Sequence, residues 1–466
     1  MTKKLRTILF SVLSVIFIIV AASAIFYAQG YRFDAKSLKF MKTGAIFIKV
    51  SPSNAKITLD QKPMGRTQII SDYLFIQSLV PKEYVIKAEK EGYLPWTKTL
   101  AVKAMEVSEA RNVVLFPENI NFPNARNGLE KMQYLGGDRA VLTYAGSDSP
   151  FKLSVYDLSS GQETDLSPAN SLLENYDLSG LKILDPQNLL LILQNKKTEK
   201  TEYFLAGTDS SQEAPQKISF LTKNSKNAML IDSFGERSLL WQEKKWIFKK
   251  TLGSSEPAFR FFDEETAAFA LSGNYFYFLT EKGRLLEMDK NKNFPERELA
   301  KNAPFELLGA ENGQDCELLI FGDEIMLKGE GNLYLLDRTK NEFKKIFEGV
   351  KNIELSPAKD KILCQLQKEL WVILLSDIDV PFKEKKGAEL FISRFSQEIQ
   401  DAGWIANDYF AFSVSNQIKI SEIDNRSQPN IYDISKFNDP KLLFGQKAKK
   451  LYILSDGSLF ASDKLF

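Results

Sequence analysis

The feature that most constrains this chain is an uncharged apolar run over residues 8–28, close to the N-terminus. About 20 apolar residues span the hydrocarbon core of a bilayer as a helix, and three serines and one tyrosine are the only polar interruptions here. Lys3, Lys4 and Arg6 precede the run. Because cations favour the cytoplasmic side of a membrane, we expect the N-terminus to stay in the cytoplasm and the residues after the run to lie outside it.

A cleaved signal peptide is the alternative interpretation of this segment. Residues 22–24 (Ala-Ser-Ala) and 28–30 (Ala-Gln-Gly) are small-residue sequences of the kind that signal peptidase accepts. The apolar region of a signal peptide is usually about 7 to 15 residues long, which is shorter than this run. We therefore expect a cytoplasmic stub and uncleaved single-pass anchor in residues 1–29, which contacts the lipid bilayer through residues 8–28. A juxtamembrane linker over residues 30–43 would follow.

Composition excludes several classes of function. Hydrophobic residues make up 44% and charged residues 26% of the chain, as in an ordinary folded domain. The 61 Lys and Arg nearly cancel the 60 Asp and Glu, so we expect no nucleic-acid partner. Histidine is absent, which excludes Ser-His-Asp and Cys-His nucleophiles and His-ligated zinc or iron.

The two cysteines, Cys316 and Cys364, are too few for a disulfide framework. We expect both to be buried small side chains. A single bridge between them is the alternative, because they fall near equivalent places in neighbouring repeats described below.

Short runs rich in β-branched and aromatic residues indicate a small all-β unit over residues 44–116. Pro, Gly, Asn and Asp separate these runs, as expected for turns between strands. No helical pattern of comparable strength occurs in this part of the chain. The expected strands are residues 45–50, 56–60, 84–88 and 99–102.

Four elements of this unit follow one another in a recognisable order: residues 50–55 (VSPSNA), 65–67 (GRT), 79–81 (LVP) and 92–96 (GYLPW). In these elements the unit resembles the PEGA domain, a short β-sandwich-like module of bacterial and archaeal envelope proteins. Ser53-Asn54 replaces the Glu-Gly of the name motif, although Asn tolerates the left-handed conformation that a glycine would supply. Lys82 and Glu83 stand where the family often has a glycine.

Three aromatic residues of this unit, Tyr84, Tyr93 and Trp96, are expected to fill its core. A contact of Trp96 with a glycan or a partner at the rim is the alternative.

From residue 120 onward, apolar runs recur that stop at or near an aspartate before a polar turn, on average about 44 residues apart. Four short strands with their turns need about 40 to 50 residues, the length of a β-propeller blade. We therefore predict a β-propeller of seven or eight blades over residues 117–466; a pair of β-sandwiches or another repetitive all-β architecture is the alternative. The anchors are Asp157, Asp209, Lys250, Asp289, Asp337, Asp377, Asp424 and Asp463.

The repeats resemble WD40-like and other divergent propellers in their rhythm, but they carry neither the Gly-His nor the Trp-Asp signature. We expect the repeated aspartates to accept hydrogen bonds from turn backbone N–H groups. Inner strands are expected at residues 140–144, 275–279, 409–413 and 451–454.

The last anchor, Asp463, leaves no sequence for an outermost strand of the final blade. We expect residues 112–116 or 120–122 to pair with that blade, which would close the ring and protect its edges.

No motif for chemistry is present: the sequence lacks a P-loop, a Cys-x-x-Cys pair and a Gly-x-Ser-x-Gly elbow. Residues 329–331 (Gly-Glu-Gly) are better interpreted as a turn. Asp377 and Asp379 have the spacing of two calcium ligands, but a solvated loop pair is the simpler interpretation. We therefore name no catalytic, cofactor-binding or metal-ligating residue.

Together these features predict a mainly β protein with one transmembrane helix, a PEGA-like domain and a propeller. The function we expect is non-catalytic binding or scaffolding in the cell envelope, with an envelope protein or glycan as partner. The alternative is an extracytoplasmic, carboxylate-dependent, glycan-active enzyme with an Asp/Glu pair across a propeller pocket.

Overall fold

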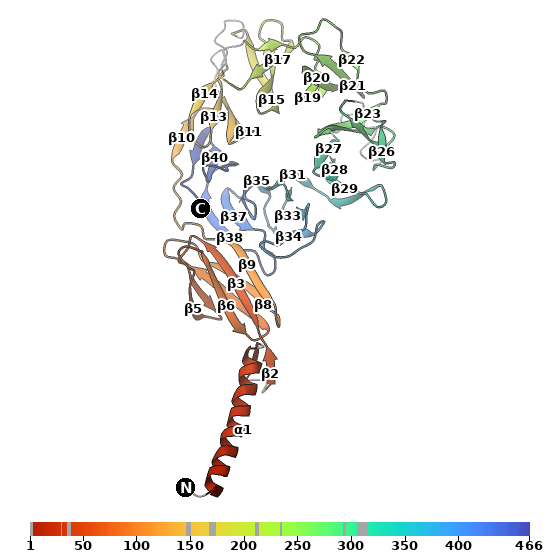
Figure 1. Ribbon diagram of the computed structural model, residues 1–466. Helices are drawn as coiled ribbons and strands as arrows, with labels where there is room; N and C mark the ends of the chain where they lie inside the picture. Colours follow the sequence, from red (N-terminus) through yellow and green to blue (C-terminus); the bar gives the residue numbers. More distant parts are fainter. Residues whose placement is uncertain are drawn as a thin grey trace.

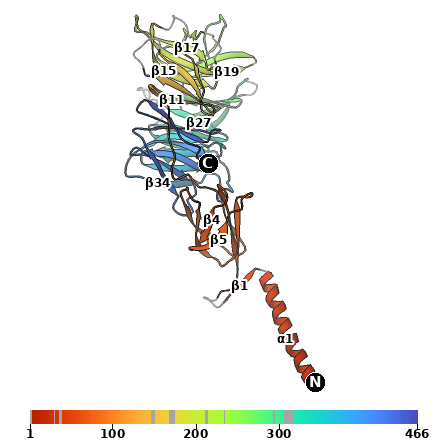
Figure 2. The ribbon, with the colours of Figure 1, turned by 90° about the vertical axis from the view of Figure 1, so that its left-hand side faces the viewer.

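The computed structural model describes residues 3–28, 30–34, 39–145, 151–166, 174–209, 214–233, 235–291, 295–304 and 316–466. A long helix leads into a small two-sheet β domain, and a ring of β-sheets follows (Figure 1). Seen from the side, the ring stands above the small domain, and the helix extends away on the opposite side (Figure 2). The fold is mainly β, as the sequence predicts.

Helix α1 (Lys3–Ala28) contains an apolar stretch, Arg6–Ala28, of 23 residues, none of which is buried inside the protein. Its length and composition suit a membrane span. The helix ends at a glycine: Gly30 has a φ of +82° and donates its N–H to the Tyr27 carbonyl at 3.1 Å, as in a helix C-cap. Residue 29 lies outside the described residues.

The expected juxtamembrane linker contains a two-stranded hairpin of β1 (Tyr31–Asp34) and β2 (Lys39–Lys42). Residues 35–38, between the strands, lie outside the described residues. Thr43 ties the hairpin to the end of the helix, because its N–H donates to the Gly30 carbonyl at 3.0 Å.

The small domain consists of two sheets that share one core. The orders are β6-β3-β9, in which β9 runs parallel to β3, and β5-β4-β7-β8. The expected segments 45–50, 84–88 and 99–102 lie in β3, β7 and β8, and the segment 56–60 runs one residue past the end of β4. The strands are β3 (Gly44–Ser51), β4 (Lys56–Leu59), β5 (Lys62–Arg66), β6 (Tyr73–Leu79), β7 (Lys82–Glu89), β8 (Trp96–Val102) and β9 (Val107–Val114).

The core of this domain comes from the inward-facing residues of both sheets, among them Ile46, Ile57, Ile86 and Trp96. Asn54 has a φ of +62°, which confirms the left-handed conformation predicted for it. Tyr84 and Trp96 are buried and Tyr93 is partly buried against the same cluster. The interpretation of the three aromatics as core residues is therefore confirmed.

Eight four-stranded sheets form the ring in the part of the chain that the structure describes. In blades 1 to 7 the four strands follow one another along the chain, with the first strand beside the central opening and the fourth at the outer rim (Figure 1). The eight sequence anchors fall at or just after the third strands, one for each blade. The segments expected as inner strands are the second strands of their blades, β12, β24, β36 and β40, because another strand lies between each of them and the opening.

Blades 1 to 4 consist of β11 (Leu129–Gly136), β12 (Arg139–Tyr144), β13 (Leu153–Asp157), β14 (Glu163–Asp165), β15 (Tyr176–Asp185), β16 (Asn188–Asn195), β17 (Thr201–Gly207), β18 (Gln216–Lys217), β19 (Ser225–Ser233), β20 (Glu236–Glu243), β21 (Trp246–Thr251), β22 (Phe259–Arg260), β23 (Thr266–Ser272), β24 (Tyr275–Thr280), β25 (Leu285–Asp289) and β26 (Arg297–Ala300). Blades 5 to 8 consist of β27 (Glu317–Phe321), β28 (Glu324–Gly329), β29 (Asn332–Asp337), β30 (Glu342–Phe347), β31 (Val350–Leu355), β32 (Lys361–Leu366), β33 (Glu369–Leu374), β34 (Glu389–Arg394), β35 (Ile399–Ala406), β36 (Tyr409–Val414), β37 (Gln417–Glu422), β38 (Ile431–Lys436), β39 (Lys441–Gly445), β40 (Lys450–Ser455), β41 (Ser458–Ala461) and β10 (Asn124–Asn127).

The ring closes in blade 8, where β10 supplies the outermost strand and pairs antiparallel with β41. Closure by an early segment is therefore confirmed. Of the two proposed segments, 112–116 is wrong, whereas 120–122 lies just before β10 and bonds to the chain directly after β41. Residues 112–114 end β9, which is already the partner of β3. Asn121 lies beside the C-terminal tail, where its carbonyl accepts the N–H of Asp463 at 2.9 Å.

Both cysteines are buried and free. Cys316 precedes the first strand of blade 5, whereas Cys364 lies in the second strand of blade 6. Their positions are therefore not equivalent, contrary to the expectation. Burial raises the pKa of the Cys316 thiol to about 12, and it also raises that of Cys364.

Candidate interaction sites

Most of the repeated aspartates organise turns, as predicted. Asp157 accepts the Ser159 hydroxyl at 2.6 Å and the backbone N–H groups of Ser160 and Ser159 at 2.7 and 2.9 Å, and these bonds, that of the Ser159 hydroxyl foremost, lower its pKa to about 2. Asp337 repeats this arrangement, and Asp289 accepts one such N–H. Asp463 differs, because it accepts a side-chain hydrogen bond from Asn121 at the ring closure.

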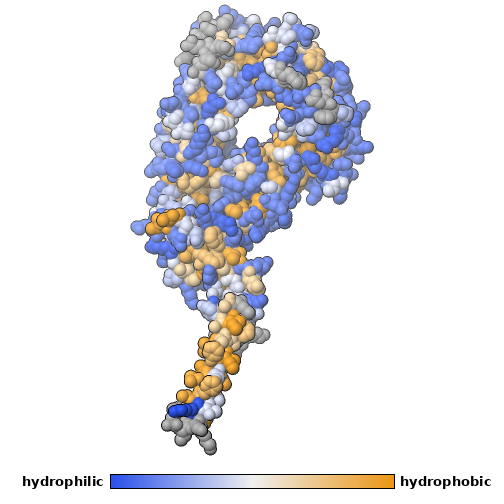
Figure 3. Space-filling model, in the orientation of Figure 1, coloured by the Kyte–Doolittle hydropathy of each residue, from blue (hydrophilic) through white to orange (hydrophobic). Residues whose placement is uncertain are grey.

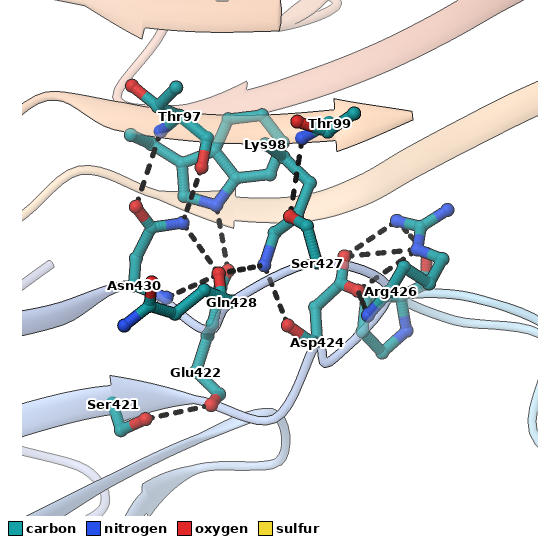
Figure 4. Close-up of polar contacts among 12 residues, drawn as sticks. Thr97, Lys98, Thr99, Ser421, Glu422, Asp424, Arg426, Ser427, Gln428 and Asn430 are labelled. Atoms are coloured by element: carbon teal, nitrogen blue, oxygen red, sulfur yellow. Dashed lines mark hydrogen bonds and ion pairs between the residues drawn. The ribbon is translucent and has the colours of Figure 1, made fainter. Parts of the chain in front are cut away.

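The small domain meets the propeller through the loop that joins β37 to β38 in blade 7, and we call this contact the junction (Figure 4). At its centre lies Lys98 of β8, whose side chain is completely buried. The Lys98 ammonium contacts Glu422 Oε1 at 2.5 Å and donates to the carbonyls of Asp424 and Gln428 at 2.6 and 3.3 Å. Its three N–H donors therefore have three acceptors on the propeller.

Glu422 is 4% exposed and collects the other half of the network. Its Oε2 accepts the indole N–H of Trp96 at 2.7 Å, and its Oε1 accepts the backbone N–H of Asn430 at 2.9 Å. A buried carboxylate is costly unless it is paired and hydrogen-bonded, and here both oxygens are satisfied. The alternative for Trp96, a contact with a glycan or a partner at the rim, is therefore wrong. Trp96 is 1% exposed, and its indole N–H donates to Glu422 inside the protein.

Propeller side chains also contact one edge strand of each sheet of the small domain. Strand β8 is an edge strand, and the Asn430 amide accepts the N–H of Thr97 at 3.4 Å and donates to its carbonyl at 2.9 Å. Arg426 reaches β9, an edge strand of the second sheet, where it donates to the Glu109 carbonyl at 2.7 Å. Unpaired strand edges invite association with other chains, and here propeller side chains occupy part of these two edges.

An apolar contact continues the junction toward blade 8. Phe116 is fully buried, and its ring lies 5.4 Å from that of Tyr409 and 5.9 Å from that of Tyr432. The Tyr409 hydroxyl accepts the N–H of Val114 and donates to the Asn112 carbonyl, both at 3.0 Å. These contacts, together with the Lys98–Glu422 pair, make the two domains one packed body.

The second site is a hollow of about 580 Å³ in the wall of the central opening, at blades 6, 7, 8 and 1. The opening runs through the middle of the ring (Figure 3). Innermost strands β31, β35, β39 and β11 line the hollow. Its side chains include Met132, Tyr134, Glu354, Asp401, Trp404, Lys441 and Phe444.

Glu354 is the most perturbed acid of this wall. Burial raises the pKa of its carboxyl to about 7, and the nearby charge of Asp401 acts in the same direction, while a hydrogen bond from the Trp404 backbone opposes both. Gly403 makes room for the carboxyl, because a Cβ at that position would lie 3.0 Å from Glu354 Oε2. This side chain therefore changes its charge near neutral pH.

Asp401 has a different role. Its two oxygens accept the backbone N–H of Leu442 at 2.7 Å and of Ala402 at 3.0 Å, so the carboxyl joins β35 to β39 across the boundary between blades 7 and 8. Burial raises its pKa as well.

A hollow of about 650 Å³ lies in another part of the wall, at blades 2, 3 and 5, and it is lined by Lys182, Lys223, Lys226 and Lys328. Burial lowers the pKa of Lys182.

The remaining sequence candidates have structural explanations. Glu330 and Gly331 have positive φ angles of 52° and 75° between β28 and β29, so the predicted turn is confirmed. Asp377 accepts the N–H of Lys386 at 3.0 Å and pairs with Lys385 at 2.7 Å. Within the described ranges, no group of three or more His, Cys, Asp or Glu side chains is arranged to hold a metal ion.

One feature of the sequence indicates the junction, although the core prediction did not use it. Strand β8 alternates buried and exposed residues, and the alternation places Lys98 on the same inward face as Trp96 and Leu100. A lysine on an inward face indicates a buried partner. No comparable pattern marks Glu354, whose carboxyl lies against residues of the neighbouring blade 7.

Comparison with known proteins identifies the small domain. Residues 43–115 match the family model of the PEGA domain, so the chain contains a PEGA domain. No curated protein sequence matches the chain.

Solved structures similar to this chain include a WD40 domain and a β-propeller domain. The WD40 domain of SCAP from fission yeast is 12% identical, with 74% of this chain and 98% of that chain covered and a TM-score of 0.42. The computationally designed Ika8 protein is 12% identical, with coverages of 72% and 96% and a TM-score of 0.42. Kluyveromyces lactis Hsv2 is 9% identical, with coverages of 68% and 100% and a TM-score of 0.42. Because these identities and TM-scores are low, the assignment of a propeller depends on the order of the strands in the eight sheets.

Proposed function

We propose that this chain is a membrane-anchored, non-catalytic binding or scaffolding protein of the cell envelope, with its PEGA domain and propeller outside the cytoplasm. The observation that carries the proposal is the junction. A buried, fully hydrogen-bonded ion pair and an aromatic cluster hold the propeller on the PEGA domain. A ring held in this way presents its opening at a constant position relative to the domain that follows the apolar helix.

The orientation follows from the cations that precede the apolar run, because positive residues favour the cytoplasmic side. The test uses a C-terminal tag and a protease, which is added to spheroplasts or to cells whose outer membrane is permeabilised and whose cytoplasmic membrane is intact. The protease should degrade the tag. In untreated samples the full-length chain should sediment with membranes. Protection of the tag in the protease-treated cells, while their cytoplasmic membrane remains sealed, would contradict the proposal.

We place the binding surface at the hollow of blades 6 to 8 and 1, because it combines apolar side chains with acids and lysines on rigid inner strands. The ligand would be an envelope protein or a glycan. A photoreactive phenylalanine analogue at Tyr134, which is 49% exposed in this hollow, should crosslink to one reproducible envelope component in living cells. Phe391 is the matched control, since it is 42% exposed but lies on β34 at the outer rim. Equal crosslinking from both positions would overturn this placement.

A carboxylate-dependent glycan hydrolase is the second candidate, and the acids of the hollow are the observation that favours it. Such enzymes need one protonated carboxyl and one free carboxylate. Glu354 has a raised pKa, but both oxygens of Asp401 are engaged by backbone N–H groups. Release of sugars from cell-wall polymers by the purified protein, abolished in Glu354→Gln, would favour the enzyme over the binding protein.

A further inference from the structure

The PEGA domain has two ends, and the one opposite the junction lies beside the end of helix α1. A chain of backbone hydrogen bonds shows this: Gly30 donates to Tyr27 at 3.1 Å, Thr43 donates to Gly30 at 3.0 Å, and Met105 donates to Thr43 at 2.9 Å. The turn between β8 and β9, which contains Met105, is therefore three hydrogen bonds away from the last turn of the helix.

The position of this turn is fixed rather than free to move away from the helix. A Cβ on Gly44 would lie 2.2 Å from the Lys103 carbonyl oxygen and 2.9 Å from that of Glu106. Only glycine permits this close approach of strand β3 to the turn. The tip of the turn therefore keeps its distance from the helix.

The side chains at this end combine apolar and cationic character. Met105 is 71% and Val107 is 46% exposed. Lys42 donates to the Met105 sulfur at 3.3 Å and its ammonium lies 5.5 Å from the centre of the Tyr31 ring. Lys103 is exposed on the same turn, and Glu106 is the one acid among the side chains of residues 103–107.

An aromatic residue and an arginine, Tyr27 and Arg32, lie at the C-terminal end of helix α1. The Arg32 guanidinium stacks over the Tyr27 ring at 3.5 Å, donates to the Tyr27 carbonyl at 3.0 Å, and reaches Ser78 of β6 at 2.9 Å. Tyr, Lys and Arg flanking an apolar span are the residues that occupy the interface between hydrocarbon and water. Arg32 here also fastens that interface region to the PEGA domain.

We propose that this end of the PEGA domain is a second membrane contact, in which Met105 and Val107 lie in the headgroup region and Lys42 and Lys103 contact phospholipid phosphates. The proposal rests on the proposed function, because it requires helix α1 to span a bilayer. A single helix would let the ectodomain rotate and tilt. A second contact beside it fixes the PEGA domain on the surface, and through the junction it fixes the ring as well.

The test uses the full chain reconstituted in phosphatidylcholine vesicles, with or without phosphatidylglycerol. An environment-sensitive fluorophore is attached to Met105→Cys, and quenching by a headgroup-linked nitroxide is measured. Ile70→Cys is the matched control, because Ile70 is apolar and 97% exposed but lies in the turn before β6, at the junction end of the same domain. Labelling of the unmutated protein measures the background from Cys316 and Cys364, both of which are buried.

Quenching at position 105 should exceed that at position 70 by about twofold or more, and it should rise with phosphatidylglycerol because anionic lipids attract basic residues near the surface. Adding Lys42→Gln and Lys103→Gln should remove that rise. Flotation of the same samples reports insertion independently of the label. Protein that floats with the vesicles but is quenched equally at both positions would overturn the second contact alone; protein that fails to float would overturn it together with the anchor.

Discussion

A buried glutamate, Glu422, and a partly buried one, Glu354, lie in neighbouring blades and have different partners. Glu422 at the junction has a lysine 2.5 Å away, an indole donor and a backbone donor. Glu354 in the wall of the central opening has one backbone donor and an acidic neighbour, and its pKa is raised to about 7. Burial acts on both, so the difference lies in the partners. A compensated carboxylate holds two domains together, whereas an uncompensated one is left to titrate or to meet a ligand.

The largest effect is expected for Lys98→Met, which removes the partner of Glu422 and leaves its charge uncompensated, like that of Glu354. A buried charge without compensation costs about 3–5 kcal/mol. We expect the free energy of unfolding to fall by that amount at pH 7, as measured by urea denaturation of the protein in detergent micelles followed by tryptophan fluorescence.

The double variant Lys98→Met/Glu422→Gln is the control for this prediction. Glutamine keeps an acceptor for the Trp96 indole but carries no charge, so the double variant should be more stable than Lys98→Met alone. Equal stability of the two would show that the lysine contributes packing rather than compensation.

The second prediction concerns Glu354→Gln and depends on pH. The folded-state pKa of about 7 lies above the usual value of 4.5, so the folded protein binds the extra proton and loses stability as pH rises from about 4.5 to 7. The variant should match the parent at pH 4.5 and exceed it by about 1–3 kcal/mol at pH 8.

Denaturation curves at both pH values, compared between variant and parent, check this. The difference between the unfolding free energies of variant and parent removes the contributions that both proteins share, among them those of the other charged residues of the hollow. The same difference at both pH values would mean that folding does not raise the pKa of Glu354.

A smaller effect is expected for Gly403→Ala, which changes the surroundings of the Glu354 carboxyl and leaves the carboxyl itself in place. The new methyl would lie 3.0 Å from Glu354 Oε2 and would move the carboxyl toward solvent. Stability at pH 5 should change by less than about 1 kcal/mol. The pH dependence should shrink, because a more exposed carboxyl has a lower pKa. Unchanged pH dependence would contradict the role assigned to this glycine.

The smallest effect is expected for Lys82→Met. Lys82 contacts Asp60 at 2.5 Å, the same distance as in the junction pair, but both side chains are well exposed. Its hydrogen bond lowers the pKa of Asp60. Water screens such pairs and competes for both charges, so the urea midpoint should not move beyond the error of the measurement. A loss approaching that of Lys98→Met would refute burial as the reason for the difference.

Sequence reasoning predicted what depends on local patterns. The alternation of apolar and polar residues located β3, β4, β7 and β8. The spacing of the eight anchors, seven of them aspartates, located the third strand of every blade. The identity of the closing strand was beyond such reasoning, because residues 112–116 and 124–127 are similar in length and distance from the last anchor. What separates them is a tertiary fact: the first segment is already paired with β3.

The junction was predictable in part. Lys98 occupies an inward position of β8, but the partner that justifies it, Glu422, lies 324 residues further along the chain. Glu354 has no such pattern in the sequence, since its raised pKa results from burial and from residues of the next blade, Asp401 and Trp404. Groups with perturbed pKa values cluster at functional sites.

The closure of the ring by β10 has a consequence for the order of assembly. Asn127 and Ser458 are in contact although 331 positions separate them, so blade 8 is incomplete until β41 has been synthesised and has paired with β10. Contacts between such distant residues form late and slowly. Until then, the edge of β10 is exposed to other chains, and removal of residues 457–466, which include β41, would leave the ring open.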